Sequence, residues 1–167
     1  MQIPGDLVAR IAEAAARSAA IRHLEADLRR DLEVELVPFA RDFVGLPDQL
    51  VRSEGTGRAG RFDALFGGVI IEFKRPGLLS ITGERSQAAE QALSYLGDET
   101  LNARAVCVTD GVTVGFLRSE TAEPDVGEQG ALPFIGADQA LVPAVNRFSW
   151  RPFDEGAPRS PSNFRWW

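Results

Sequence analysis

The sequence predicts an α/β fold in which a central mixed β-sheet is flanked by helices. The first observation is the order of the patterns along the chain, which is one long helix, three strands, a helix and two strands. The second is the composition: 44% of the 167 residues are hydrophobic, which is enough for one buried core and too few residues for two full domains. We therefore expect one α/β domain.

A helix is predicted from Pro4 to about Phe43, because its apolar residues recur at spacings of three and four. These residues form one stripe: Ile21, Leu24, Leu28, Leu32 and Leu36. Pro38 predicts the end of this helix or a kink in it, and the Gly-Leu-Pro-Asp sequence at 45–48 predicts a loop.

Three strands are predicted next, at 49–54, 61–66 and 69–74, and the last two form a hairpin around Gly67-Gly68. The glycines between 55 and 60 match the spacing of a dinucleotide-binding motif, but that motif requires a helix after its last glycine. Since a strand is predicted there instead, we exclude a dinucleotide site.

The pattern at 86–96 predicts a helix closed by Gly97, and 105–109 and 112–117 predict a second hairpin around Asp110-Gly111. We assign residues 1–118 to one core. Residues 119–167 contain six of the ten prolines and end on two tryptophans, so we expect a C-terminal extension that packs on the core or leads into a missing domain.

The net charge of −6 argues against a surface that is basic throughout, which strong nucleic-acid binders usually have. Cationic residues nevertheless cluster within about 35 residues, and it is local potential that attracts phosphate. The cluster comprises Arg52, Arg58, Arg61, Lys74, Arg75 and Arg85. The sequence has neither a signal peptide nor a run of roughly 20 apolar residues, so we expect a cytoplasmic protein without a membrane segment.

Lys74 is the only lysine, against seventeen arginines. Lysine is a compact donor whose pKa shifts on burial, which suits it to hold and polarise a water molecule. Glu72 lies two residues earlier and therefore on the same strand face. Pairing across the Gly67-Gly68 turn brings Asp63 level with Glu72 to within a residue.

Two carboxylates, from Asp63 and Glu72, and the backbone carbonyl of Phe73 would form a hard oxygen site suited to Mg²⁺, for which Mn²⁺ could substitute. Lys74 would orient or deprotonate the attacking water, which predicts phosphodiester hydrolysis. We expect alanine at Asp63, Glu72 or Lys74 to abolish cleavage with little loss of fold. The plainer alternative is an exposed hairpin with a salt bridge.

The sequences Gly60-Arg-Phe-Asp63 and Ile70-Ile-Glu-Phe-Lys-Arg-Pro76 resemble the PD-(D/E)xK nuclease superfamily. The similarity covers about residues 20–118 and is greatest to the N-terminal nuclease domains of restriction enzymes fused to methyltransferase or helicase modules. Phe62 replaces the proline expected before the aspartate. The resemblance implies a restriction-endonuclease-like sheet and cleavage of DNA.

The resemblance also implies further site residues. Gln91 and Tyr95 match the Gln-x-x-x-Tyr element, which would lie on a helix beside the active site and position metal or DNA. An acidic residue of the first helix should face the metal, and we choose Glu25. Its competitors are Asp31, Glu33 and Glu35, and the candidate phosphate contacts are Arg58, Arg61, Arg75 and Arg85.

The predicted function is thus a Mg²⁺-dependent DNA nuclease, the nuclease domain of a larger restriction or phage-defence protein joined to a methyltransferase or helicase. The alternatives are an inactive module of the same fold that binds DNA or docks a partner, and a domain that self-associates through Trp166-Trp167. The sequence does not predict a recognition sequence, a strand preference or a choice between endonuclease and exonuclease action. It also leaves open whether the isolated chain is active, whether it forms a homodimer and whether RNA is a substrate.

Overall fold

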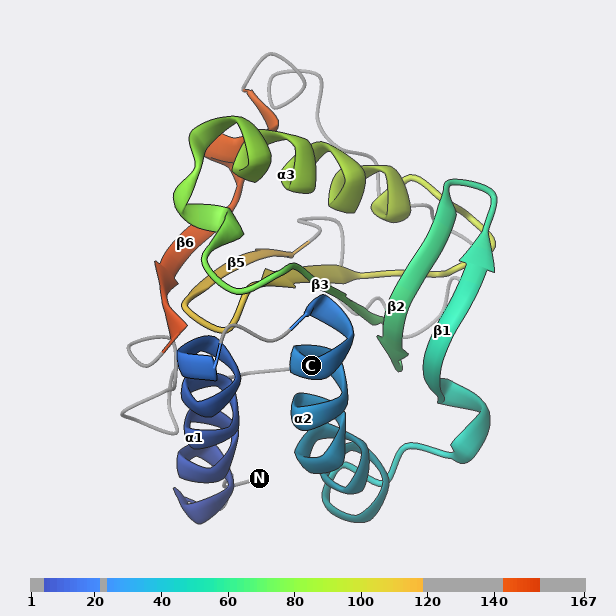
Figure 1. Cartoon of the computed structure of the whole chain (residues 1–167). Coiled ribbons are helices and arrows are strands. Elements are labelled where there is room, and N and C mark those ends of the chain that lie inside the picture. The colour runs from blue at the N-terminus through green and yellow to red at the C-terminus, as the bar shows by residue number, and fades with distance from the viewer. Residues whose placement is uncertain (1–4, 22–23, 119–142, 154–167) are drawn as a thin grey trace.

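A six-stranded mixed sheet lies between two helical layers in a computed structural model that describes residues 5–21, 24–118 and 143–153 (Figure 1). Helices α1 (Gly5–Ile21) and α2 (Glu25–Pro38) cover one face, and α3 (Thr82–Leu96) covers the other. The predicted α/β class with a mixed sheet flanked by helices is confirmed.

The strands follow one another across the sheet in chain order. All neighbouring pairs are antiparallel except β3 and β4, which are parallel and are joined by the crossover helix α3. The strands are β1 (Val51–Gly57), β2 (Gly60–Phe66), β3 (Val69–Phe73), β4 (Ala105–Thr109), β5 (Thr113–Arg118) and β6 (Ser149–Pro152).

The single N-terminal helix predicted from the apolar stripe is wrong, because the chain forms two helices that lie side by side (Figure 1). Leu28 and Leu32 are buried, but Ile21 and Leu24 are 64% and 69% exposed. Ile21 and Leu24 lie where α1 ends and α2 begins, so the predicted apolar stripe does not form one continuous helix face there. Pro38 ends α2 as expected, and a π-helical segment, Phe39–Phe43, follows it.

Two separate cores pack against the two faces of the sheet. Ile70 lies in the core beneath α3, whereas Ile71 and Phe73 lie in the core beneath α1 and α2. The alternation predicted for this strand is confirmed, and the pairing Ala64↔Ile71 and Phe66↔Val69 has the predicted register. Glu72 therefore lies on the α3 face while its neighbours are anchored in the opposite core.

The glycine-rich segment is part of a hairpin rather than a loop, because β1 extends through Gly57 and pairs with β2. This hairpin is kinked opposite Asp63. Glu54 has a φ of 60°, and the Glu54–Asp63 step is missing from an otherwise continuous register. Phe62 packs in the same core as Leu65, although regular alternation would place them on opposite faces. Asp63, opposite the kink, lines the same pocket as Glu72.

Residues 143–153 pack on the core and add a strand that was not predicted. A short 3₁₀ helix, Ala144–Arg147, precedes β6, which pairs with β5, and Phe148 lies in the core beneath α3. These residues belong to the segment 119–167, for which the sequence predicted either packing on the core or a lead into a missing domain. Residues 119–142 and the Trp166-Trp167 end lie outside the described residues.

Helix α3 begins at Thr82, four residues before the predicted start at Ser86. The preceding 3₁₀ turn, Leu78–Ser80, is held by the buried carboxylate of Asp110, which accepts the Leu79 N–H at 2.8 Å. This long-range contact gave no sequence signal. Across residues 5–21, 24–118 and 143–153, no helix is long and apolar enough to cross a bilayer.

Candidate active site

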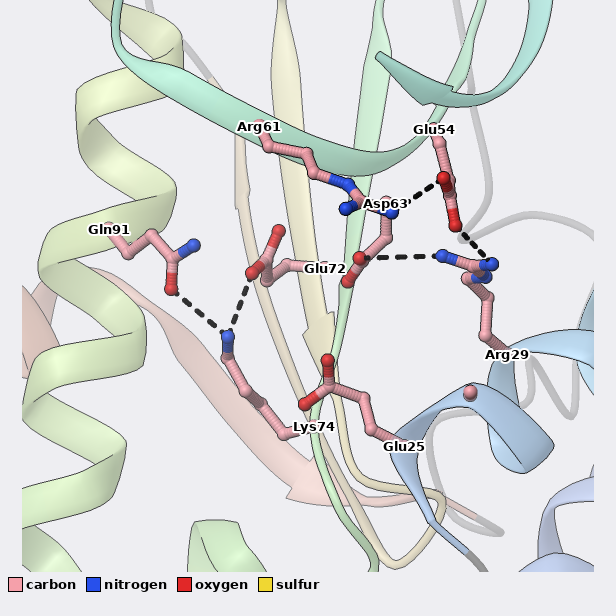
Figure 2. A pocket seen from close by; sticks show the side chains of 9 residues that line it. Glu25, Arg29, Glu54, Arg61, Asp63, Glu72, Lys74 and Gln91 are labelled. Atoms are coloured by element: carbon pink, nitrogen blue, oxygen red, sulfur yellow. Dashed lines mark hydrogen bonds and ion pairs between the residues drawn. The ribbon is translucent and has the colours of Figure 1, made fainter. Parts of the chain in front are cut away.

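A polar pocket of about 410 Å³ opens where α2, the β1–β2 hairpin, β3 and α3 meet (Figure 2). Its walls carry both charge signs and almost no apolar side chains. The lining residues are Glu25, Ala26, Arg29, Glu54, Arg61, Asp63, Glu72, Lys74 and Gln91. Five of these are predicted catalytic residues, which come from four different elements of the fold.

Asp63 is fixed by the backbone of the neighbouring strand. Its Oδ2 accepts the Phe73 N–H at 2.8 Å. Phe73 lies just beyond the last β2–β3 pair, so this side chain takes the place of the backbone carbonyl that would accept the N–H in a longer pairing. The Phe73 ring is fully buried in the opposite core. Phe73 is not among the residues that line the pocket, and with its ring buried only its backbone carbonyl could serve the predicted ligand role.

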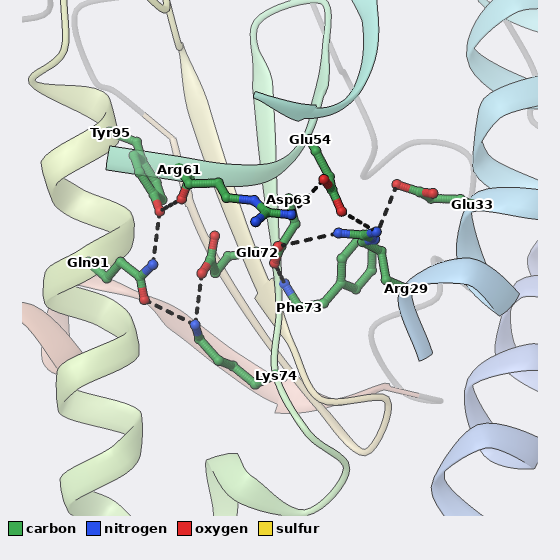
Figure 3. Close-up of polar contacts among 10 residues, drawn as sticks. All are labelled: Arg29, Glu33, Glu54, Arg61, Asp63, Glu72, Phe73, Lys74, Gln91 and Tyr95. Carbon is green, nitrogen blue, oxygen red and sulfur yellow. Dashed lines mark hydrogen bonds and ion pairs between the residues drawn. The ribbon is translucent and has the colours of Figure 1, made fainter. Parts of the chain in front are cut away.

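A chain of hydrogen bonds joins the carboxylate of Glu72 to helix α3 (Figure 3). The Lys74 Nζ donates to Glu72 Oε1 at 2.8 Å and to Gln91 Oε1 at 3.0 Å. Gln91 Nε2 donates to the Tyr95 hydroxyl at 2.9 Å, and that hydroxyl donates to the backbone carbonyl of Arg61. Since an ammonium has three N–H donors, one donor of Lys74 is not used by these contacts.

Glu72 is the most perturbed acid of the pocket. Its pKa is raised to about 7, first by burial and second by the nearby charge of Asp63, while Lys74 lowers it. Glu72 is 3% exposed, and its Oε2 is buried without a hydrogen-bond partner. A buried carboxylate oxygen with no partner is costly unless another group, such as a cation, completes its surroundings.

Glu25, at the first turn of α2, reaches the pocket as the resemblance implied. Burial raises the pKa of its carboxyl, Lys74 lowers it and Asp63 raises it. The competing acids lie elsewhere on the helix. Asp31 accepts a hydrogen bond from Ser18 at 2.6 Å, and Glu35 pairs with Arg10 at 2.8 Å, so both join α2 to α1.

Glu33, the third competitor, is not among the residues that line the pocket. Its Oε1 lies 3.9 Å from Arg29 Nε (Figure 3). Glu33 therefore contacts Arg29, which lines the pocket, but does not line the pocket itself.

Sequence reasoning missed Arg29 and Glu54. Arg29 Nη2 lies 2.5 Å from Glu54 Oε1, and its Nη1 lies 3.9 Å from Asp63 Oδ1. Arg29 could have been found, because it lies four residues after Glu25 and so shares its helix face. Glu54 could not, since the kink in β1 places it here.

Of the arginines predicted to contact phosphate, only Arg61 lines the pocket. Arg58 and Arg75 are exposed outside it. The guanidinium of Arg85 lies 5.1 Å from the centroid of the Trp150 ring and donates to the Leu79 carbonyl, so it serves packing near β6.

Tyr95 was also predicted to contact DNA, and its burial contradicts this. Tyr95 is 1% exposed, and its hydroxyl contacts Gln91 and the Arg61 carbonyl inside the protein. Burial raises the pKa of its hydroxyl to about 12. Tyr95 therefore holds Gln91 and the Arg61 backbone in place.

The donor set of the pocket suits a small hard cation. Asp63, Glu72 and Glu25 supply carboxylates, and the unpartnered Glu72 Oε2 is an available ligand atom. Among the residues that the structure describes, no three His, Cys, Asp or Glu side chains are grouped closely enough to form a ready-made metal cluster. The set thus fits Mg²⁺, which keeps several waters and takes few protein ligands, better than a metal that requires a complete protein cage.

Comparison with protein-family models, with curated proteins and with solved structures gave no match. The geometry of the pocket therefore carries the functional proposal.

Proposed function

We propose that this protein is a Mg²⁺-dependent DNA nuclease that hydrolyses phosphodiester bonds. One observation carries the proposal: the Asp63 carboxylate, the unpartnered Oε2 of buried Glu72 and the ammonium of Lys74 lie together in one polar pocket. An exposed salt-bridged hairpin, the plainer alternative, would leave Glu72 in solvent, but Glu72 is 3% exposed.

Asp63 and Glu72 would hold the ion, together with the Phe73 carbonyl, and Mn²⁺ would substitute for Mg²⁺. The bound ion would supply charge stabilisation for the phosphoryl oxygens and would lower the pKa of a coordinated water. Glu25 lies close enough to Lys74 and Asp63 to affect the charge balance of the pocket.

Lys74 is proposed to act on the attacking water. Two of its donors are held by Glu72 and Gln91, which leaves the third to bind a water at a fixed position. Gln91 is oriented by Tyr95, which is itself anchored on the Arg61 backbone. The lysine therefore has little freedom to rotate away, and positioning of this kind lowers the barrier to in-line attack.

The second candidate is an inactive module of the same fold that binds DNA or docks a methyltransferase or helicase. The net charge of −6 favours it, and so does the Arg29–Asp63 contact, which engages one of the proposed ion ligands. We rank it second because a degenerate site has no need to keep a buried carboxylate without a partner.

Cellular placement and partners follow from the same proposal. We propose a cytoplasmic protein that acts on DNA and is linked covalently to a methyltransferase or helicase domain in a restriction or phage-defence system. A homodimer would supply a second active site for double-strand cutting.

The test is cleavage of supercoiled plasmid, linear duplex and single-stranded DNA with Mg²⁺ or Mn²⁺, with EDTA as the metal-free control. We expect metal-dependent nicking by the native protein and none by Lys74→Ala. Equal activity of the two proteins would contradict the proposal. If neither protein cuts, calorimetry with Mn²⁺ decides between a fragment that needs its DNA-targeting partner, which binds metal, and a degenerate site, which does not.

A further inference from the structure

Glu54 joins two arginines across the pocket. Its Oε1 lies 2.5 Å from Arg29 Nη2, and its Oε2 lies 2.5 Å from Arg61 Nη2 (Figure 2). Arg29 comes from α2 and Arg61 from β2, so these two elements meet through one carboxylate. All three side chains line the same pocket as Asp63 and Lys74.

The backbone at Glu54 is unusual for its residue type. Its φ of 60° lies in the left-handed region, and Asn102 is the only other non-glycine residue with positive φ in the described part of the chain. Glycine and asparagine adopt this conformation more easily than glutamate. We infer that glutamate is present at this position for its carboxylate, since another residue type would adopt this backbone conformation with less strain.

The next residue has no room for a side chain. A Cβ added to Gly55 would lie 2.3 Å from Phe62 Cζ, because the buried Phe62 ring packs directly on the glycine. The kink at Glu54 thus lies directly beside a tightly packed part of the hairpin, and the Glu54 side chain pairs with both arginines.

Arg29 is not fully satisfied by its present partners. Its side chain is 22% exposed, and its Nε is buried without a hydrogen-bond partner. Guanidinium groups bind phosphate oxygens with the same geometry as carboxylate oxygens. Two guanidinium groups that each hold one oxygen of the same anion therefore match the two non-bridging oxygens of a phosphodiester.

We propose that Arg29 and Arg61 form a binding site for one phosphodiester of DNA, and that the carboxylate of Glu54 occupies this site in the free protein. DNA must displace Glu54 from both arginines before its backbone can enter the pocket. The proposed nuclease function supplies only the identity of the ligand, because binding of the anion does not require hydrolysis.

The experiment measures binding of a fluorescein-labelled DNA duplex by anisotropy in EDTA, so that no cleavage occurs. Glu54→Gln keeps the size of the side chain and removes its charge, and it should tighten binding on the order of tenfold. Glu99→Gln is the matched control, because Glu99 is exposed outside the pocket and its loss changes the net charge equally. It should change affinity by less than about twofold. Equal effects of the two variants, or no binding by Glu54→Gln, would overturn the proposal.

Arginine variants test the other half of the site. Arg29→Gln and Arg61→Gln should each weaken binding on the order of tenfold and abolish the gain from Glu54→Gln, whereas Arg17→Gln, on the exposed side of α1, should not. Arg29→Lys keeps the charge in case the glutamine variant fails to fold, and it should bind less tightly than the native protein because lysine lacks the fork. Arginine variants that bind like Arg17→Gln would refute the site.

The outcomes separate this proposal from the proposed function. If Glu54→Gln tightens binding but the native protein neither cleaves DNA nor binds Mn²⁺ in calorimetry, the phosphodiester site stands and the nuclease fails. If the native protein cleaves DNA but Glu54→Gln behaves like Glu99→Gln, the nuclease stands and self-occupation by Glu54 fails.

Discussion

The carboxylate of Asp63 accepts the backbone N–H of Phe73 at 2.8 Å, so a side chain of β2 satisfies the last donor of β3. This contact fixes Asp63 beside Glu72. The charge of Asp63 raises the pKa of the Glu72 carboxyl. The contact with Phe73 also gives Asp63 a structural role besides the proposed chemistry. An alanine at this position would leave the Phe73 N–H without its partner, so the expectation that Asp63→Ala removes only chemistry needs correction.

Asp63→Asn separates the two roles, because the amide oxygen can still accept the Phe73 N–H while the charge is lost. We expect the variant to fold normally and to bind Mn²⁺ at least about tenfold more weakly, since even outer partners of metal ligands have effects of that size. Calorimetric titration with Mn²⁺ measures this. Asp48→Asn, at an exposed position outside the pocket, is the control. Unchanged metal affinity would remove Asp63 from the ion site.

Lys74→Arg tests whether the lysine contributes more than positive charge. Arginine keeps the charge but stays protonated and has a planar fork, so it cannot deprotonate a water or hold one at the same point. We expect the plasmid-nicking rate to fall by about 10²–10⁴, the usual contribution of acid–base catalysis. Arg75→Lys, at the exposed adjacent residue, should cleave normally. Full rescue by arginine would show that only charge is needed.

The raised pKa of Glu72 predicts how stability depends on pH. Its pKa is about 7 in the folded protein against 4.5 as the ordinary value, so between these values the folded state binds more protons than the unfolded chain. Glu72 therefore lowers the free energy of unfolding as pH rises from about 4.5 to 7, and the loss is complete above 7. Glu72→Gln should lack this loss, which thermal melts from pH 5 to 8 would detect.

Magnesium should reverse the effect at the alkaline end of this range. At pH 8 Glu72 is charged, so an ion at its Oε2 offsets the cost of burial and should raise the Tm of the native protein but not of Glu72→Gln. Each kcal/mol of stabilisation corresponds to roughly 2–4 °C for a domain of this size. Equal shifts in both proteins would indicate that the ion binds elsewhere.

Tyr95→Phe removes the hydroxyl that orients Gln91 and caps the Arg61 carbonyl. We expect a loss of about 1–2 kcal/mol in unfolding free energy, because a part-buried carbonyl loses its donor, together with slower cleavage. Gln91→Ala should slow cleavage with a smaller change in stability, since Gln91 is exposed. Gln87→Ala, on the same helix but outside the pocket, is the control for both. Native cleavage rates in Tyr95→Phe and Gln91→Ala would show that these residues do not position Lys74.

Asp110 is predicted to be a stability residue rather than a site residue. It is fully buried, and its carboxylate accepts the N–H groups of Leu79, Val112 and Thr113. Asp110→Ala leaves all three donors without this acceptor, and we expect a loss of about 2–4 kcal/mol in urea unfolding. Asp110→Asn should lose less, because it keeps an acceptor oxygen. A neutral alanine variant would show that water replaces the carboxylate.

Features of this protein that depend on local sequence pattern could be predicted before the structure was known. Strand alternation and the Gly67-Gly68 turn were sufficient to predict the register that brings Asp63 level with Glu72, because the pairing of a tight hairpin is set by its turn. The four-residue spacing of Gln91 and Tyr95 likewise placed both on one face of α3, and the resemblance pointed to Glu25.

Features that depend on contacts between distant segments could not be predicted in this way. The break between α1 and α2 lies within a continuous apolar stripe, and β6 follows a long stretch that gave no strand pattern. The kink at Glu54 lies beside the contact of the Phe62 ring with Gly55, and Glu54 pairs with both Arg29 and Arg61. Burial of Glu72, and hence its raised pKa, is also a property of the assembled pocket, since desolvation depends on every element packed around the carboxylate.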